Sequence, residues 1–413
     1  MRAADIILLQ MSFPNHELGR VSPQTAGLSQ SRLNRIRPVM DRLVSTNRIA
    51  GGIGLIARHG KIAFLESWGM ADKDTGIAMR EDAIFRIYSM TKAVTGVAAM
   101  LLYEEGLFGL LDPVSNYLPE FGGMQVAIEQ DAKLTGTVPA DRPITVLDLM
   151  RHTAGFNYHG PHDENGELTY QKLGLQMGHG SILLSEMTRL LSQAPLVNHP
   201  GTVWDYGFGT DVLGRLVEVL SGQTLDQFFA ERIFQPLDMR DTGFHVPEDK
   251  WDRLTTLYQP NADGTVSRTS FVAQESYKKM PLLLMGGAGL ASTIRDYARF
   301  AQMLLNGGEL HAERLLSPKT VQLMSADHLG TIPISGALLP QGHGFGLTFA
   351  VSRGPGQTAT LPSPGQFRWG GYAGTSFWID PRENMIGVFM MQTMGDLAKR
   401  TLFQQLAYQA IIE

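Results

Sequence analysis

The sequence of 413 residues contains no cysteine. Disulfides, thiol nucleophiles and cysteine-ligated metals are therefore excluded, whereas chemistry based on serine, histidine, lysine or carboxylates remains open. Basic residues are not in excess either, because the formal net charge is −5 and no dense Lys/Arg stripe occurs. We therefore expect no nucleic-acid partner.

Long apolar runs are also missing. No uninterrupted stretch approaches the ~20 residues that span a bilayer, so no membrane partner is expected. The first residues, "MRAADIILLQMSFPNH", hold an apolar core that is too short for a signal sequence, and they lack an A-x-A-like cleavage site. A cytoplasmic protein is the resulting expectation. The composition, with 43% hydrophobic and 18% charged residues, is typical of globular proteins.

Strand patterns lie near both ends of the chain. The stretch "GGIGLIARHGKIAFLESWG" predicts two strands that are joined by a tight turn at His59-Gly60. In the last third, "GFGLTFAVS", "TSFWID" and "MIGVFMMQ" predict neighbouring strands, and "DLAKRTLFQQLAYQAI" predicts a closing helix. Between about residues 91 and 285 the pattern is mostly helical, and Thr145 with Asp148 has the spacing of a capping box.

These patterns predict an α+β protein whose antiparallel sheet, flanked by helices, is built from both chain ends. The sheet domain would comprise residues 1–90 and 286–413. A mainly helical domain, residues 91–285, would be inserted between them, with the active site at the junction. We expect the loops within residues 120–185 and 255–285 to shape the substrate pockets.

One candidate for catalysis is the stretch "FRIYSMTKAV", which places Ser89 and Lys92 three residues apart at the start of a predicted helix. At this spacing both side chains share one face of the helix. If apolar neighbours desolvate Lys92, its pKa falls, and the neutral amine can accept the proton of the serine hydroxyl. Free backbone N–H groups at a helix start can also stabilise an oxyanion. The pattern therefore predicts a serine nucleophile with a lysine base.

Other residues offer competing sites. The S-x-x-K pattern is weak, and a second copy, Ser276 to Lys279 in "QESYKKMP", lies among polar residues that would keep its lysine solvated. No G-x-S-x-G elbow occurs, which argues against a Ser-His-Asp triad of the α/β-hydrolase type. The glycine-rich stretch "GGAG", residues 286–289, matches no phosphate-binding fingerprint and predicts a turn at a strand edge.

Histidines gather in "RHTAGFNYHGPHDENG". The members of this group are His152, His159 and His162, followed by Asp163 and Glu164. Their spacing matches no familiar zinc pattern such as H-E-x-x-H. We interpret the segment as a solvated loop that is rich in turn residues, and we expect no metal site and no cofactor.

The stretch "FRIYSMTKAVTGVAAMLLYEEGLFGLLDPVSNYLPEF" resembles the nucleophile region of serine β-lactamases and penicillin-binding proteins. The stretches "ITVLDLMRHTAGF", "PGTVWDYGFGTDVLGRLVEVLSG", "IFQPLDMRDTGF" and "GGAGLASTIRDYARFAQMLLNGG" follow in the order typical of class C β-lactamases, D-alanyl-D-alanine carboxypeptidases and their esterase relatives. The resemblance covers most of residues 30–395. It implies the fold of these enzymes.

Residue by residue, the resemblance places Ser89 on the nucleophile and Lys92 on its partner lysine. Tyr206, in "WDYGFG", falls on the tyrosine of the Y-x-N element. Such a tyrosine near Lys92 would share the proton of Ser89, donate it to the leaving group and help a water attack the acyl-enzyme. The alternative is that Tyr206 only packs with Trp204 and Phe208.

The sequence departs from the β-lactamase pattern at two elements. Phe208 stands in place of the asparagine of Y-x-N, so an amide that would contact substrate is missing and the phenyl ring is expected to face the substrate instead. In "FRWGGYAGTSFWID", Trp369, Gly370 and Gly371 occupy the place of K-T-G. Tryptophan cannot replace the charge of that lysine, which would bind a carboxylate. Trp369 would offer a flat wall to the acyl or alcohol part, or be a buried strand aromatic.

W-G-G at this place resembles the family VIII carboxylesterases, which cleave simple esters. The two glycines would let the strand approach the acyl group, so that the N–H groups of Ser89 and Tyr372 form the oxyanion hole. The resemblance thus implies a serine carboxylesterase for short- to medium-chain acyl esters, with a small-molecule substrate. A β-lactamase or D-amino-acid peptidase, and a catalytically silent binding relative, remain the alternatives. The sequence specifies neither the ester nor the oligomeric state.

Overall fold

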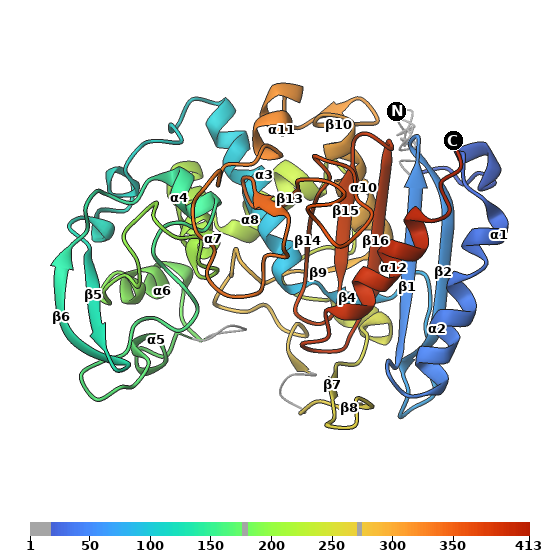
Figure 1. Ribbon diagram of the computed structural model, residues 1–413, viewed down its shortest axis with the longest axis horizontal. Helices are drawn as coiled ribbons and strands as arrows, with labels where there is room; N and C mark the ends of the chain where they lie inside the picture. The colour runs from blue at the N-terminus through green and yellow to red at the C-terminus, as the bar shows by residue number, and fades with distance from the viewer. Residues whose placement is uncertain (1–17, 176–180, 271–274) are drawn as a thin grey trace, which may run out of the picture.

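The computed structural model describes residues 18–175, 181–270 and 275–413, and an eight-stranded antiparallel sheet is its central feature (Figure 1). In sheet order the strands are β12 (His343–Phe345), β13 (Ala350–Ser352), β14 (Phe367–Gly370), β15 (Ser376–Asp380), β16 (Met385–Met391), β1 (Gly51–Arg58), β2 (Lys61–Asp72) and β3 (Ile77–Ala78). Strand β16 pairs with β1, which joins the two ends of the chain. The predicted α+β fold with a sheet built from both ends is confirmed.

Helices cover both faces of this sheet (Figure 1). Helix α10 (Ile294–Leu305) packs on one face against β15 and β16, while α2 (Ile36–Ser45) and α12 (Ala398–Tyr408) pack on the other. Successive residues of β1 divide between the two faces, since Leu55 belongs to the core under α10 and Ile56 to the core under α12. Strands β1 and β16 are buried at every position, which explains their continuous apolar runs.

The turn between β1 and β2 follows the prediction. His59 and Gly60 have φ values of 53° and 73°, and Arg58 pairs with Lys61 across the turn. A two-residue hairpin of type I′ requires positive φ at both central residues, and its twist matches that of the flanking strands. The turn therefore fixes the register of the strands next to it.

The segment between the two sheet-forming parts holds most of the remaining helices. They are α3 (Thr91–Glu104), α4 (Val146–Met150), α5 (Thr169–Lys172), α6 (Leu184–Leu191), α7 (Gly209–Ser221) and α8 (Leu225–Phe229). Helix α3 packs against α7 and α8, and residues 91–102 are all buried. A helix that is enclosed on all sides needs no amphipathic stripe, which accounts for its uniform apolar sequence.

Two hairpins in this segment were not predicted. They are β5–β6 (Gln125–Gln130, Lys133–Pro139) and β7–β8 (Tyr258–Pro260, Val266–Arg268). Most of their residues are exposed or half-buried, so no strong hydrophobic alternation marks these strands. The mainly helical pattern predicted there is therefore incomplete.

Several short α-helices and strand pairs lie elsewhere in the chain. These are α1 (Gln30–Leu33), the pair β4–β9 (Ile84–Arg86, Ala291–Thr293), the pair β10–β11 (Glu309–Leu310, Glu313–Arg314) and α11 (Pro318–Met324). Where the described chain forms helices, none combines the length and the apolar character needed to cross a membrane.

The single strand predicted for "GFGLTFAVS" is wrong, because the chain reverses within it and forms β12 and β13. Thr348 has a φ of 73°, and its N–H donates to the Met150 carbonyl at the end of α4. A side chain on Gly96 of α3 would clash with Thr348, since an ideal Cβ there would lie 2.2 Å from the Thr348 hydroxyl oxygen. This close approach turns the chain at a position where the apolar pattern alone predicts extension.

The predicted capping box at the start of α4 is confirmed. Thr145 accepts a hydrogen bond from the Asp148 N–H, and the Asp148 carboxylate accepts one from the Thr145 N–H. Arg142 and Arg151 also donate to Asp148. Although burial opposes it, these hydrogen bonds lower the pKa of Asp148 to about 2. Helix α4 is thus anchored immediately before the turn that leads to the site described below.

Candidate active site

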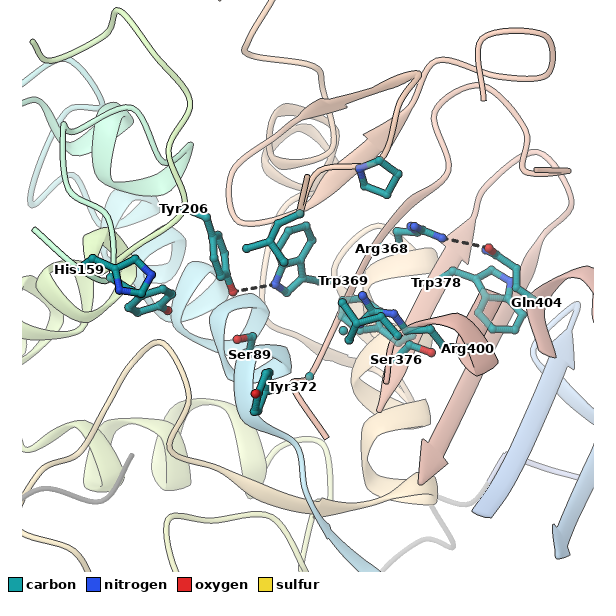
Figure 2. Close-up of a pocket in the computed structure, with 17 residues that line it drawn as sticks. Ser89, His159, Tyr206, Arg368, Trp369, Tyr372, Ser376, Trp378, Arg400 and Gln404 are labelled. Carbon is teal, nitrogen blue, oxygen red and sulfur yellow. Dashed lines mark hydrogen bonds between the residues drawn. The ribbon is translucent and has the colours of Figure 1, made fainter. Parts of the chain in front are cut away.

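A cavity of about 240 Å³ lies beside Ser89 (Figure 2). It is bounded by the short 3₁₀ helix η2 (Tyr88–Met90), the loop after α4, the segment before α7, strands β14 and β15, and helix α12. Six residues singled out from the sequence line this one cavity: Ser89, Tyr206, Trp369, Gly370, Gly371 and Tyr372. Segments that are far apart in the chain therefore meet at one site.

Ser89 lies in η2, directly before α3, and Lys92 lies in the first turn of α3. The Lys92 side chain has no exposed surface, although Ser89 itself lines the cavity. The Lys92 ammonium nitrogen Nζ donates to the Gly287 carbonyl at 2.7 Å and to the Tyr158 hydroxyl at 2.8 Å, and it lies 3.5 Å from Ser89 Oγ. A neutral Lys92 has two N–H groups for Gly287 and Tyr158 and a lone pair for the Ser89 hydroxyl proton.

The second S-x-x-K copy has a different environment. Lys279 is exposed to solvent, and neither Ser276 nor Lys279 lines the cavity. The Ser276 carbonyl accepts a hydrogen bond from the buried Arg86. The alternative nucleophile thus lacks both a buried lysine and access to the cavity.

Tyr158 was missed by the sequence reasoning, although it contacts Lys92 directly. Its ring is half-buried, and the ring centroids of Phe208 and Tyr206 lie 4.9 Å and 5.4 Å from its own. Burial, with smaller contributions from Tyr206 and Asp211, raises the pKa of Tyr158 well above its usual value. The phenol therefore keeps its proton while it accepts a hydrogen bond from Lys92.

Tyr206 meets Lys92 through its ring, not through its hydroxyl group. The Lys92 Nζ lies 4.7 Å from the ring centroid of Tyr206, which is the geometry of a cation–π contact. The hydroxyl group of Tyr206 accepts a hydrogen bond of 3.1 Å from the indole N–H of Trp369 (Figure 2). Trp369 is thus more than a flat wall or a buried strand aromatic, because it fixes where the Tyr206 hydroxyl group points.

The strand that carries Trp369 passes very close to the serine. An ideal Cβ on Gly371 would lie 2.3 Å from the Ile87 carbonyl oxygen, so only glycine allows this approach. Beyond Gly371 the chain leaves the ladder of β14, and within the described residues the Tyr372 N–H makes no main-chain hydrogen bond. The Ser89 N–H lies in the first turn of η2, where no carbonyl of the same helix can accept it. Two N–H groups are thus available beside the serine.

The model of the family described as Beta-lactamase matches residues 35–409. The chain belongs to the Beta-lactamase family. Among its relatives, Protein Rv1367c of Mycobacterium tuberculosis is 34% identical over 357 residues, which cover 85% of this chain and 87% of that protein. Esterase EstB of Burkholderia gladioli is 30% identical over 364 residues, which cover 84% of this chain and 86% of EstB.

A solved structure shows the same fold. EstCE1, described as a hydrolase with promiscuous acyltransferase activity, superposes with a TM-score of 0.75 and 28% sequence identity, over 93% of this chain and 99% of EstCE1. This member of the Beta-lactamase family is thus similar to an esterase, EstB, and it has the fold of the β-lactamases.

A buried carboxylate supports the lysine in this Beta-lactamase family member. Asp211 of α7 is fully buried, and its Oδ1 accepts a hydrogen bond of 2.8 Å from the Gly287 N–H, while the Gly287 carbonyl accepts one from Lys92. Burial raises the pKa of Asp211 to about 6, although Lys92 and the Gly287 N–H oppose this rise. An ideal Cβ on Gly287 would lie 2.6 Å from Asp211 Oδ2. The glycine-rich segment predicted as a strand-edge turn therefore connects Asp211 to Lys92.

Two expectations about the surroundings of the site need correction. Phe208 does not line the cavity, because it is fully buried behind Tyr158 at the start of α7. It supports Tyr158 and does not face the substrate. His152 is not solvated but buried against Trp204 and Tyr206, and burial together with the Lys92 charge lowers its pKa well below the usual value. Its neutral ring packs under the Tyr206 ring.

The remaining histidines of that segment lie apart. His159 lines the cavity, whereas His162 is half-buried and contacts Glu129. Within the described part of the chain, no group of three or more potential ligand side chains could hold a metal ion.

The pocket walls differ in part from the expectation. Tyr158 and His159 come from the predicted loop region 120–185, but none of the described residues within 255–285 lines the cavity. Leu338, Pro340 and the side chains of α12 take their place. Helix α12 packs against β16, and it reaches the site through Phe403, which contacts Trp378 of β15, and Gln404, which contacts Arg368 of β14. Sequence patterns do not specify these contacts.

Proposed function

We propose that the protein is a serine carboxylesterase that hydrolyses short- to medium-chain acyl esters. The observation that carries this proposal is the fully buried Lys92, which contacts both Ser89 and Tyr158 at the edge of a cavity. In this position Lys92 takes the proton of Ser89 as its Oγ attacks the carbonyl carbon of the ester. The N–H groups of Ser89 and Tyr372 hold the oxyanion that forms.

The two tyrosines then have separate tasks. Tyr158 is hydrogen-bonded to Lys92 and serves the nucleophile. Tyr206 is directed by Trp369 into the cavity, and it protonates the departing alcohol. The alcohol leaves first. The Tyr206 phenolate then takes a proton from the water molecule that attacks the acyl-enzyme, and Lys92 returns its proton to Ser89 Oγ as the acid leaves. Apart from this water, every catalytic group in the proposed cycle belongs to the chain.

Ester cleavage is favoured over β-lactam or peptide cleavage by the two departures from the β-lactamase pattern. Trp369 stands where a lysine would bind the carboxylate of a β-lactam, and its N–H is used by Tyr206. Phe208 is buried and offers no amide to a substrate. EstB and EstCE1, which are described as an esterase and a hydrolase, support the same choice.

The proposal is tested by comparing p-nitrophenyl butyrate with nitrocefin as substrates, and by labelling the protein with an alkyl phosphonate. We expect faster turnover of the ester, by about 10²-fold or more in kcat/KM, and a single covalent label on Ser89 in peptide mass spectra. Preferential hydrolysis of nitrocefin would favour the β-lactamase alternative. If the protein neither hydrolyses the two substrates nor becomes labelled, this result would favour a silent binding protein.

Asp211 provides a prediction about pH. Its carboxylate charge stabilises the ammonium group that forms when Lys92 takes the serine proton. Because the pKa of Asp211 is about 6, the carboxylate is lost below that pH, and kcat/KM should fall as the pH drops through this range. Asp211→Asn keeps an acceptor for the Gly287 N–H but has no charge. We expect this variant to be about tenfold slower at pH 8, which corresponds to roughly 1.4 kcal/mol, and to lack the acidic limb.

The measurement is the pH profile of kcat/KM for both proteins, with the circular dichroism spectrum as a control for folding. His159→Gln is the comparison variant, since His159 also lines the cavity. An acidic limb that survives in Asp211→Asn and disappears in His159→Gln would contradict the assignment to Asp211.

A further inference from the structure

The end of the cavity beyond Trp369 carries two guanidinium groups (Figure 2). Arg368 belongs to β14 and Arg400 to α12, and both line the cavity. The Nη1 of Arg368 donates to Gln404 Oε1 at 3.1 Å. Neither arginine forms an ion pair with any carboxylate that the structure describes, and Asp396, just before α12, pairs with Lys399 instead. Two positive charges thus face the cavity without an ion-pair partner, although the Asp396 carboxylate acts on Arg400 from beyond ion-pair distance.

Three neighbouring side chains add polar atoms that have no partner. The amide nitrogen of Gln404, the indole N–H of Trp378 and the hydroxyl group of Ser376 are buried, and within the described chain none of them makes a hydrogen bond. All three residues line the same end of the cavity as the arginines. Since a guanidinium group can only donate, Arg368 must meet the oxygen of Gln404, which leaves the Gln404 NH₂ group without an acceptor.

These groups share one property, because each can donate a hydrogen bond. Buried donors without acceptors cost free energy, and three of them side by side next to two guanidinium groups are unusual in a folded protein. Burial lowers the pKa of Arg400 to about 10, and the Arg368 charge adds to this effect. Burial lowers the pKa of Arg368 as well. An anion that lies between the two guanidinium groups would satisfy the donors and compensate both charges.

The cluster lies next to the reacting strand. An ideal Cβ on Gly370 would lie 2.1 Å from Arg400 Nη1, so the guanidinium group occupies the space that a side chain at 370 would fill. Gly370 is two residues before Tyr372, whose N–H is assigned to the oxyanion. An ester held by Ser89 and Tyr372 would therefore extend one of its arms towards Arg400.

We infer that Arg368 and Arg400, together with Ser376, Trp378 and Gln404, form a subsite for a carboxylate group that the ester substrate carries. This inference rests on the proposed esterase function and specifies its substrate class. A carboxylate fits because its two oxygens match the planar fork of a guanidinium group. Trp369 lacks the positive charge of the lysine that it replaces. In this subsite Arg368 of β14 and Arg400 of α12 supply a positive charge instead.

The test compares esters that differ only in charge. Mono-p-nitrophenyl adipate and its neutral adipamide analogue examine the acyl arm, while p-carboxyphenyl butyrate and p-carbamoylphenyl butyrate examine the alcohol arm. We expect kcat/KM to favour the acid over the amide in one of the two pairs by at least about tenfold. In Arg400→Gln this ratio should fall by about the same factor, and Arg400→Lys should keep part of it.

Arg37→Gln is the matched control, because it removes the same charge from a half-exposed residue of α2 that does not line the cavity. It should leave both ratios unchanged. A ratio near one for both pairs in the wild-type protein would overturn the subsite while leaving the esterase function intact. If no ester is hydrolysed, the proposed function fails instead, and isothermal titration calorimetry with adipate still tests the subsite.

In the calorimetric test, binding of adipate to the wild-type protein and not to Arg400→Gln would support the subsite. Absence of binding would overturn it, as would tighter binding of inorganic phosphate than of adipate. If Arg400→Gln does not fold, Trp378→Phe removes one donor of the cluster and should weaken adipate binding several-fold. Unchanged binding in this variant would count against the inference.

Discussion

Ser89→Ala should lower kcat/KM for p-nitrophenyl butyrate by about 10⁴-fold or more, with little change in thermal stability. The oxygen of its hydroxyl group is the atom that would form the acyl-enzyme, and in the described chain the buried Lys92 Nζ contacts this hydroxyl group and that of Tyr158. Ser89 lines the cavity, so loss of its hydroxyl group removes no buried hydrogen bond apart from the long contact with Lys92. Initial rates at several substrate concentrations and a thermal melt provide the two readouts.

Ser276→Ala is the matched control for this prediction, since Ser276 has the same S-x-x-K spacing but does not line the cavity. It should keep the activity of the wild-type protein. If Ser276→Ala lost activity and Ser89→Ala retained it, the assignment of the nucleophile would be wrong. If both retained activity, the protein would hydrolyse esters by a different chemistry.

Local sequence patterns were sufficient for those parts of the fold that short-range interactions determine. The β1–β2 turn depends on two adjacent residues that adopt positive φ, and the α4 capping box depends on Thr145 and Asp148. The S-x-x-K spacing likewise places Ser89 and Lys92 together at one helix start. In each case the interacting groups lie within four residues of one another, so the sequence alone describes the contact.

Contacts between distant segments could not be predicted in this way. Tyr158 lies in a loop whose composition marks it only as a turn. Its contact with Lys92 exists because α4 packs against α7 and α7 packs against α3. Asp211 lies in the buried first turn of α7. Its role depends on the N–H of Gly287, which belongs to a distant segment of the chain. A carboxylate in the buried stretch of a helix is itself a signal, since such residues are rarely buried without a partner.

Two aromatic residues near the site lie in positions that differ from those predicted from the sequence. The sequence placed Phe208 at the substrate and His152 in solvent, whereas both pack behind the tyrosines, Phe208 against Tyr158 and His152 against Tyr206. These rings pack against the tyrosine rings and restrict their movement. Lys92 donates a hydrogen bond to the hydroxyl group of Tyr158, and Trp369 donates one to that of Tyr206. The hydroxyl groups of both tyrosines are therefore positioned by neighbouring side chains, of which only Trp369 also lines the cavity.

Tyr206→Phe and Tyr158→Phe should differ in how their effects depend on the leaving group. If Tyr206 protonates the departing alcohol, its loss should matter little for p-nitrophenyl butyrate, because p-nitrophenolate is stable without a proton. Ethyl butyrate releases a strongly basic alkoxide, so for this ester we expect Tyr206→Phe to lower kcat/KM by about 10² to 10⁴-fold. Tyr158 serves Lys92 and the nucleophile, so Tyr158→Phe should slow both esters by similar factors.

The two variants serve as controls for each other, since each removes one phenolic hydroxyl group from the same wall of the cavity. The decisive quantity is the ratio of kcat/KM for the two esters, which cancels any general loss of active protein. A larger leaving-group dependence in Tyr158→Phe than in Tyr206→Phe would mean that Tyr158 protonates the alcohol and that Tyr206 supports Lys92. The hydrogen bond from Trp369 to Tyr206 would then be structural. Equal dependence in both variants would mean that the tyrosines act as one coupled pair, as their ring contact also allows.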